Sequence, residues 1–327
     1  MSADRRNWKP LPPPLKAAVA AFDHWTNAFL SARDARDQIV TPLYHYTDAA
    51  GLEGIVKTQQ VWSTDFTHLN DPSELTYGMA IASELLSEIG QASDSRTRIF
   101  CDMVNDLFTH KNMRGAFGFF VSSFSQERDD LGQWRAYGDN GRGFALGLSP
   151  QVFRIEQKAD RKPHENVFVV PVVYDRHAAR RHHMPAIEQA VRIVGKTVEQ
   201  ASDLMQDSNV GMPFLDEMAK ALIAAQLIIN SLTIKHEAYQ HEREVRLIIL
   251  GEQTNLAPYI STRAGRSEIV PFIKSDMPVQ AKDNVAEIVI GPAASAGAED
   301  WVQALLEPFH DVPASILHRS TIPYRAN

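Results

Sequence analysis

The residues with the clearest chemical potential lie just before an apolar run near residue 250. Glu242, Glu244 and Arg246 alternate there and lead into Leu247 and the apolar residues after it. Because side chains two positions apart on a strand share a face, a strand that begins by Glu242 would carry both carboxylates and the guanidinium on one side. Such a strand end can point carboxylates into a cleft. The simpler explanation is a solvated strand end with a salt-bridge ladder, which contributes little to stability.

His45 is the second residue of interest. It stands between Tyr44 and Tyr46 in the short run 43–47, which has the composition of a strand and ends at Thr47. A histidine in this setting can contact a ligand. The alternative is a core histidine whose ring is satisfied by a backbone carbonyl.

Aromatic residues and glycines follow one another between residues 134 and 147. Trp134 and Tyr137 offer aromatic surfaces, and Gly143 and Gly147 flank the expected strand 143–148. Glycines at these positions can let a ligand approach the backbone, and they can equally serve a turn and a bulge. The segment is not a dinucleotide-binding fingerprint, because no strand is followed by Gly-x-Gly-x-x-Gly.

Other common chemistries lack their sequence signatures. The 12 histidines form no His-Glu-x-x-His motif, so we expect no metal. Cys101 lies in an apolar helical stretch and is expected to be inert packing. No Gly-x-Ser-x-Gly nucleophile elbow is present, and a metal-dependent nuclease would need clustered acids that we do not find.

The periodicity predicts an α+β fold. We expect a proline-rich and helical arm over residues 1–40, followed by a single α+β domain over 41–327 with a large helical insertion at about 176–236. Strands cluster on both sides of this insertion rather than alternating with helices, which favours a mixed or antiparallel central sheet with flanking helices.

Composition limits the partners. The net charge is −7, from 33 basic and 40 acidic residues, which gives no strong signal for nucleic-acid binding. The longest uncharged apolar run, 221–234, is shorter than the about 20 residues that a membrane-spanning helix needs. The first residues lack the apolar stretch of a secretory signal, and a single cysteine suits a reducing compartment. We therefore expect a cytoplasmic protein with no membrane partner.

Several short motifs, in order along about 280 residues, resemble a bacterial family known as domain of unknown function 2971. The motifs that carry the resemblance are Leu43-Tyr44-His45-Tyr46-Thr47, Gly51-Leu52-x-Gly54-Ile55, Val61-Trp62-Ser63-Thr64, Leu69-Asn70-Asp71-Pro72-x-Glu74, Ser122-x-x-Ser125, Gln133-Trp134-x-x-Tyr137-Gly138, Gly143-Phe144-Ala145-Leu146-Gly147, Glu242-x-Glu244-Val245-Arg246-Leu247, Ile288-Val289-Ile290-Gly291-Pro292 and Ser320-x-Ile322-Pro323-Tyr324-Arg325.

The order of a histidine strand, a helix, a second strand and a late glutamate strand is also similar to the ADP-ribosyltransferase fold. That resemblance implies that His45 binds a ribose hydroxyl of NAD, that Tyr77 or Tyr137 packs on the nicotinamide, and that Glu244 or Glu242 binds the nicotinamide ribose. The implied dinucleotide site is completed by the neighbouring residues Tyr46, Thr47, Trp134 and Arg246.

The function that this resemblance implies is consumption of NAD, by transfer of ADP-ribose to a macromolecular acceptor or by hydrolysis, in a toxin or phage-defence effector. The chemistry is plausible for these residues, because a carboxylate near the ribose stabilises the oxocarbenium ion that forms when the N-glycosidic bond breaks. The alternative is a non-catalytic sensing or protein-interaction module of a stress or defence system, in which the same polar residues form a buried structural network.

Overall fold

The computed structural model describes residues 8–69, 74–109, 111–112, 117–154, 162–265, 268–308 and 316–326. Residues 70–73 of the Leu69-to-Glu74 motif lie outside the described residues. The chain divides into two compact units, each built from three separate segments. The first unit contains residues 1–37, 71–115 and 173–237, and the second contains 38–70, 116–172 and 238–327. The N-terminal arm and the helical insertion expected from the sequence thus belong to one unit, together with a third segment.

The first unit is helical. Its helices are α1 (Pro13–Arg36), α3 (Glu74–Gln91), α4 (Ser95–Leu107), α7 (Arg176–Gln200), α8 (Ser202–Gln206), α9 (Ser208–Leu222), the π-helical turn η6 (Ile223–Leu227) and α10 (Ile228–Leu232). Aspartates at 94, 175 and 207 begin three of them, because each carboxylate accepts hydrogen bonds from free backbone amides of the first turn. No described helix is both long enough and apolar enough to cross a bilayer.

The second unit is built on a sheet in which ten strands are described. They are β1 (Leu43–Thr47), β2 (Gln60–Asp65), β3 (Phe117–Ser125), β4 (Phe144–Leu148), β5 (Val167–Pro171), β6 (Glu244–Glu252), β7 (Ser261–Ala264), β8 (Ile269–Asp276), β9 (Val285–Ile290) and β10 (Leu317–Arg319). The order is β10-β9-β4-β1-β3-β2-β8-β7, and β6 lies between β3 and β5. Among the described strands only β9 and β10 pair in parallel, so the sheet is mixed and mostly antiparallel. This confirms the predicted α+β class.

Short helices complete the second unit. The α-helices are α2 (Ala49–Thr58), α6 (Leu131–Ala136), α11 (Gln253–Leu256) and α12 (Ala298–Leu306). The 3-10 turns are η2 (Phe66–His68), η3 (Asp139–Gly141), η4 (Pro150–Phe153), η5 (Pro163–Glu165), η7 (Glu237–Glu242) and η8 (Ala257–Tyr259).

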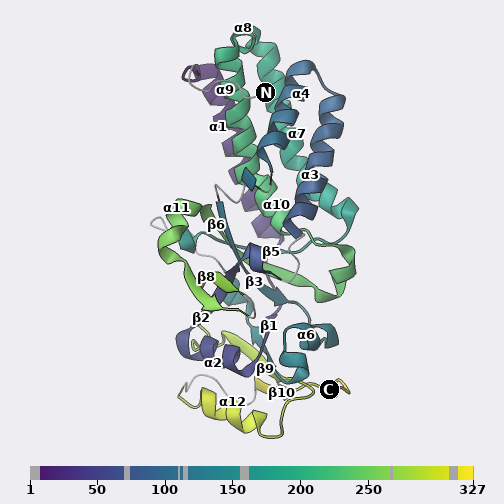
Figure 1. Cartoon of the computed structure of the whole chain (residues 1–327), viewed down its shortest axis with the longest axis vertical. Helices are drawn as coiled ribbons and strands as arrows, with labels where there is room; N and C mark the ends of the chain where they lie inside the picture. The colour runs from purple at the N-terminus through teal and green to yellow at the C-terminus, as the bar shows by residue number, and fades with distance from the viewer. Residues whose placement is uncertain are drawn as a thin grey trace. The chain divides into compact units, whose positions relative to one another are not determined.

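The two faces of the sheet carry different side chains. One face holds the main apolar core of this unit, where Phe124 and Val245 of the central strands pack with residues of α2 and α12. These two helices lie side by side in Figure 1. The opposite face holds a smaller aromatic cluster under α6, which includes Tyr46 and Trp134. Both faces of the central strands therefore carry apolar clusters. Polar residues on the face with the aromatic cluster are exceptions to this pattern.

Strand β3 is the branching point of the sheet. Along one edge it pairs with β6 over its whole length, from Phe117 to Ser125. Its other edge is shared, because β2 pairs with it at Phe120 and Val121 and β1 pairs with it at Ser125. The strands β1 and β2 therefore separate beside residues 122–124 of β3.

Candidate functional site

The register of β3 and β6 places the polar residues of both strands on one face. Ser125 lies opposite Glu244, and Ser123 lies opposite Arg246. Directly paired residues share a face, so these four side chains point away from the main apolar core. Glu244 and Arg246 thus lie on one face of β6, as predicted. Ser123 and Ser125 of β3 lie on the same face.

Glu244 and Arg246 form a closely satisfied pair. Arg246 Nε donates to Glu244 Oε1 over 2.8 Å, and Nη2 donates to Oε2 over 3.0 Å. The Ser123 hydroxyl donates a further hydrogen bond of 2.6 Å to Glu244 Oε1. Glu244 is 6% exposed and Arg246 1% exposed, so the pair is buried rather than the solvated ladder that the simpler explanation predicted. Three donors fix the plane and position of this carboxylate.

Ser123 is an exposed residue that contacts this buried pair. It is exposed, although its neighbours Ser122 and Phe124 are 4% and 2% exposed. It lies beside the place where β1 and β2 separate, and among the described strands neither of the two pairs with β3 at this residue. On the same face, Trp62 of β2 is 44% exposed. An exposed residue therefore contacts Glu244 in the middle of a sheet whose other β3 side chains are largely buried.

Glu242 reaches the same region by a different route from the one predicted. The strand begins at Glu244 rather than by Glu242, and Arg243 adopts a left-handed conformation with φ of 42°. The Ser125 hydroxyl donates to the Glu242 carbonyl over 2.7 Å, and the Tyr137 hydroxyl donates to Glu242 Oε1 over 3.3 Å. Backbone strain of this kind in a non-glycine residue is concentrated at functional sites. The structure thus brings Tyr137 to Glu242, and Arg243 forms the turn between Glu242 and Glu244.

His45 does not join them. Its strand neighbours on the same face are Leu43 and Thr47, and its ring centroid lies 5.4 Å from that of Phe124, which belongs to the main apolar core. Its Nδ1 lies 3.1 Å from the Ser123 carbonyl, and burial lowers the pKa of the imidazole despite this hydrogen bond. The expectation that His45 and Glu244 share a cleft is wrong, because their side chains point to opposite faces of the sheet. A histidine satisfied by a backbone carbonyl, the alternative explanation, is what the structure contains.

The remaining predicted residues divide between the two faces. The Tyr46 hydroxyl donates to the Glu127 carbonyl over 2.8 Å, and the ring packs edge-on against Trp134 with centroids 4.8 Å apart. Burial raises the pKa of Tyr46. Thr47 lies instead on the His45 face, at the start of α2 beside Gly51. Tyr77 belongs to the first unit, where its ring packs against His236.

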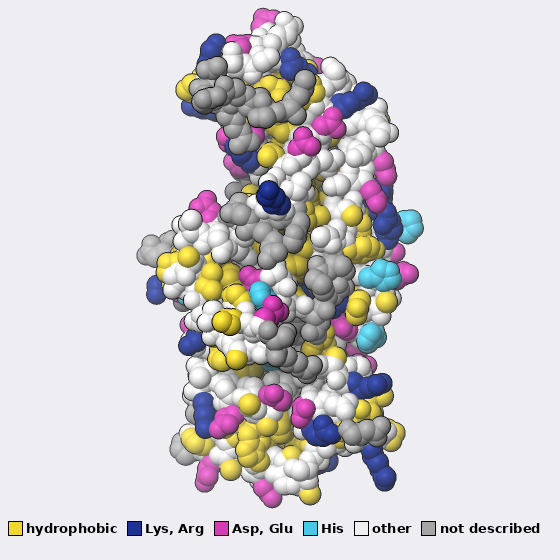
Figure 2. All heavy atoms as spheres, in the orientation of Figure 1, with side chains coloured by type: hydrophobic (Ala, Val, Ile, Leu, Met, Phe, Trp, Pro, Cys, Tyr) yellow, Lys and Arg dark blue, Asp and Glu magenta, His cyan; other side chains and the backbone are white. Residues whose placement is uncertain are grey.

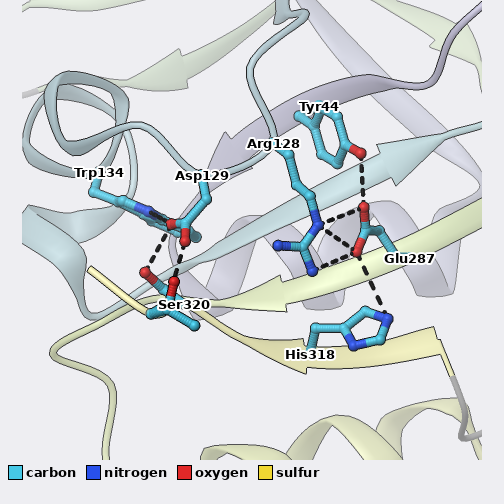
Figure 3. Close-up of polar contacts among 8 residues, drawn as sticks. Tyr44, Arg128, Asp129, Trp134, Glu287, His318 and Ser320 are labelled. Atoms are coloured by element: carbon cyan, nitrogen blue, oxygen red, sulfur yellow. Dashed lines mark hydrogen bonds and ion pairs between the residues drawn. The ribbon is translucent and has the colours of Figure 1, made fainter.

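A second polar network on the Glu244 face was not predicted. Figure 3 shows Glu287 of β9 between Tyr44, Arg128 and His318. Tyr44 donates to Glu287 Oε1 over 2.7 Å, Arg128 contacts both carboxylate oxygens at 2.8–2.9 Å, and His318 Nε2 lies 3.7 Å away. Burial pushes the pKa of Glu287 up, but the hydrogen bonds from Arg128 and Tyr44 outweigh it and the net pKa is lowered.

A separate cluster around Asp129, the neighbour of Arg128 in the sequence, holds the C-terminal segment. Asp129 accepts from Trp134 Nε1 over 2.6 Å, from the Ser320 hydroxyl over 2.7 Å and from the Thr321 amide over 3.3 Å (Figure 3). This buried indole is therefore a structural anchor rather than a free aromatic surface. Gly147 is the residue from which the sequence could have indicated the Glu287 network, because a Cβ there would lie 2.8 Å from Tyr44 Cε1. The absence of a side chain at Gly147 lets Tyr44 cross β4 and reach Glu287.

Nothing in the described part of the chain resembles a metal centre. No three His, Cys, Asp or Glu side chains lie close enough there to hold an ion. The site consists of carboxylates, hydroxyls, a guanidinium and aromatic rings, which suits a ligand with hydroxyl groups.

A family model described as a protein of unknown function, DUF2971, matches residues 133–247. This supports the resemblance to that family over this part of the chain. The matched range includes Trp134, Tyr137, Glu242, Glu244 and Arg246, and it excludes His45. Neither curated proteins nor solved structures give a match to this chain. The similarity to the ADP-ribosyltransferase fold therefore stays a prediction.

Proposed function

We propose that the protein consumes NAD by cleaving the bond between nicotinamide and ribose at the Glu242–Glu244 turn. The observation that carries this proposal is the exposed Ser123, whose hydroxyl contacts the buried Glu244 carboxylate over 2.6 Å. A ribose hydroxyl that replaces or joins the Ser123 hydroxyl would reach the same carboxylate. The strained Arg243 between the two acids is the second support, because such strain is retained where function requires it.

The proposed chemistry breaks the C1′–N bond, with the electron pair leaving on nicotinamide. The ribose then carries oxocarbenium character until water or an acceptor hydroxyl adds at C1′ and loses a proton. Glu244 stabilises that positive charge, and Arg246 and Ser123 fix its orientation before the reaction. Glu242, which accepts the Tyr137 hydroxyl, provides a second carboxylate for the ribose or for the proton of the incoming nucleophile.

This proposal differs from the site expected from the sequence in one respect. His45 contacts neither substrate nor Glu244, and it supports the site only by binding the Ser123 carbonyl. Tyr137 keeps the aromatic role, since it lies on the Glu242 side of the sheet. We propose water or a macromolecule as the acceptor of the ADP-ribose, in a toxin or phage-defence effector.

A second candidate function is non-catalytic, with the same residues as a scaffold for sensing or protein interaction. It is favoured by the burial of Arg246, which is 1% exposed and bound to both oxygens of Glu244. In that case the pair would specify the strand register and have no substrate.

The two candidates are separated by an assay of nicotinamide release from NAD, with and without cell extract as a source of acceptors. Glu244→Gln, assayed at a temperature at which the variant is folded, should reduce release at least about 100-fold, a loss typical for removal of a group that stabilises the charge of the transition state. Glu252→Gln is the matched control, since Glu252 ends the same strand and is exposed. If wild-type protein releases no nicotinamide under either condition, and Glu244→Gln only lowers the melting temperature, the scaffold is the correct account.

A further inference from the structure

An exposed aromatic stack lies on β2 and β8. The rings of Trp62 and Phe272 are stacked, with centroids 4.3 Å apart and an interplanar angle of 20°. The Arg263 guanidinium carbon lies 5.8 Å from the Trp62 ring centroid. Trp62 is 44% exposed, whereas Phe272 is 4% exposed. The tryptophan is thus held in place by a buried ring and presents part of its surface to solvent.

The pairing of four strands places this stack on the Glu244 face of the sheet. Thr64 lies opposite Phe272 on one side and opposite Val121 on the other, so Trp62, Phe272 and Val121 share a face. Val121 shares that face with Ser123, two residues along β3. The Ser63 and Ser122 hydroxyls lie 2.9 Å apart, which shows that β2 and β3 stay in register there. In the described part of the chain β2 does not pair with β3 beyond this point, so Trp62 and Ser123 share a face of the sheet without being paired.

Two cations accompany the tryptophan on that face. Lys274 is its direct partner on β8, and Arg263 of β7 donates to the Thr64 hydroxyl over 3.1 Å. Both residues are exposed. An aromatic ring beside cations binds nucleotides well, because the ring stacks on the base and the cations attract the phosphate. Asp276 lies farther along the same face, hydrogen-bonded to Gln60, and limits the basic surface to the immediate surroundings of Trp62.

We infer that Trp62, Arg263 and Lys274 form a subsite for an adenine nucleotide, with the base stacked on Trp62 and phosphate near the two cations. This inference rests on the proposed function and specifies how the second half of the dinucleotide is held. The site is small, since the exposed Asp276 follows Lys274 on the same face of β8 and interrupts the basic surface. Acidic and basic side chains are likewise interspersed on the face of the molecule shown in Figure 2. A mononucleotide therefore fits it better than a nucleic-acid strand, which needs a continuous positive path.

The test uses AMP as the probe and the full chain, with binding measured by isothermal titration calorimetry. Trp62→Ala should weaken AMP binding about tenfold, the effect expected from loss of one stacked base. Trp62→Phe should stay within about threefold of wild type, because a phenyl ring also stacks. Ile269→Ala is the matched control: Ile269 is a 70% exposed apolar residue of β8 on the opposite face, and its removal should leave binding unchanged.

The phosphate contact has its own comparison. Lys274→Ala should weaken AMP more than adenosine, and it should make AMP binding less sensitive to salt. The inference is overturned if wild-type protein does not bind millimolar AMP, or if Trp62→Ala binds AMP as tightly as wild type. AMP binding that depends on Trp62, in a protein that releases no nicotinamide from NAD, would support the subsite and reject the proposed reaction.

Discussion

The Ser123 hydroxyl donates a 2.6 Å hydrogen bond to Glu244, and this contact joins an exposed residue to a buried carboxylate. The two residues come from strands more than one hundred positions apart, and Arg246 lies directly opposite Ser123. The carboxylate is therefore positioned by one strand through a hydroxyl and by its own strand through a guanidinium.

The buried pair predicts strong coupling between Glu244 and Arg246. Either Glu244→Gln or Arg246→Met alone should destabilise the protein by about 3–5 kcal/mol, because one charge is left buried without its partner. The double variant should lose less than the sum of the two, as measured by chemical denaturation. Lys57→Met, which breaks an exposed pair with Glu53, should cost about 1 kcal/mol or less. Additive losses from the two single variants would contradict the pairing.

Gly147 predicts a steric effect on the second network. Alanine there would place Cβ 2.8 Å from Tyr44 Cε1 and 3.1 Å from the Glu287 carbonyl oxygen, so Gly147→Ala should destabilise by about 1–3 kcal/mol. Gly54→Ala is the control, because nothing lies within 4 Å of that Cβ in α2, and helix propensity should stabilise the protein by about 0.5–1 kcal/mol. Thermal melts of both variants test the pair. Equal shifts in the same direction would count against the close approach of Tyr44.

Glu287 predicts a dependence of stability on acid. Its pKa is lowered in the folded protein, so its contribution is fully present above the ordinary carboxyl pKa of about 4.5 and is lost as the pH falls through the lowered value. Glu287→Gln should therefore cost about 1–3 kcal/mol at pH 7, and the difference from wild type should shrink below pH 4.5. Denaturation at pH 7, 5 and 3.5 measures this. A difference that is constant with pH would show that the carboxylate charge does not matter.

His183 of α7 makes a prediction about the helical unit. It is fully buried, and burial, together with the neighbouring His182, lowers its pKa to about 3. In the unfolded chain His183 becomes protonated near pH 6.5, whereas in the folded protein it stays neutral down to about pH 3. The free energy of unfolding therefore falls as the pH drops from 6.5 toward 3. Relative to His183→Leu, wild-type protein should lose about 2–3 kcal/mol between pH 7 and 4.5. Parallel pH profiles for the two proteins would mean that His183 is protonated without cost.

The sequence was sufficient for the strand that carries the site. The apolar run after Arg246 predicted a buried strand, and the spacing of Glu244 and Arg246 correctly placed them on one face. The prediction that Glu242 lies on the same strand face was wrong. The alternation of side chains holds only for extended backbone, and Arg243 adopts a left-handed conformation. No residue type at that position indicates a positive φ, since arginine seldom adopts one.

The residues on β3 and β2 could not be identified from the sequence alone. The face of Ser123 depends on its register with β6, which is fixed by pairing across more than one hundred residues. The motif on which the resemblance was based contains Ser122 and Ser125, whereas the exposed serine lies between them. His45 shows the same limit, since a strand one residue out of phase points its side chain to the opposite face.

The most direct test of the account is the rate of nicotinamide release from NAD by Ser123→Trp. Because Ser123 is exposed, an indole at this position should block the approach to Glu244, and Ser123→Ala separates this effect from loss of the hydroxyl and its hydrogen bond. We predict an active wild type, a partial loss for Ser123→Ala, and at least an about 100-fold loss for Ser123→Trp at the melting temperature of Ser123→Ala. An active wild type whose rate is unaffected by Ser123→Trp would show that NAD does not reach Glu244 past Ser123.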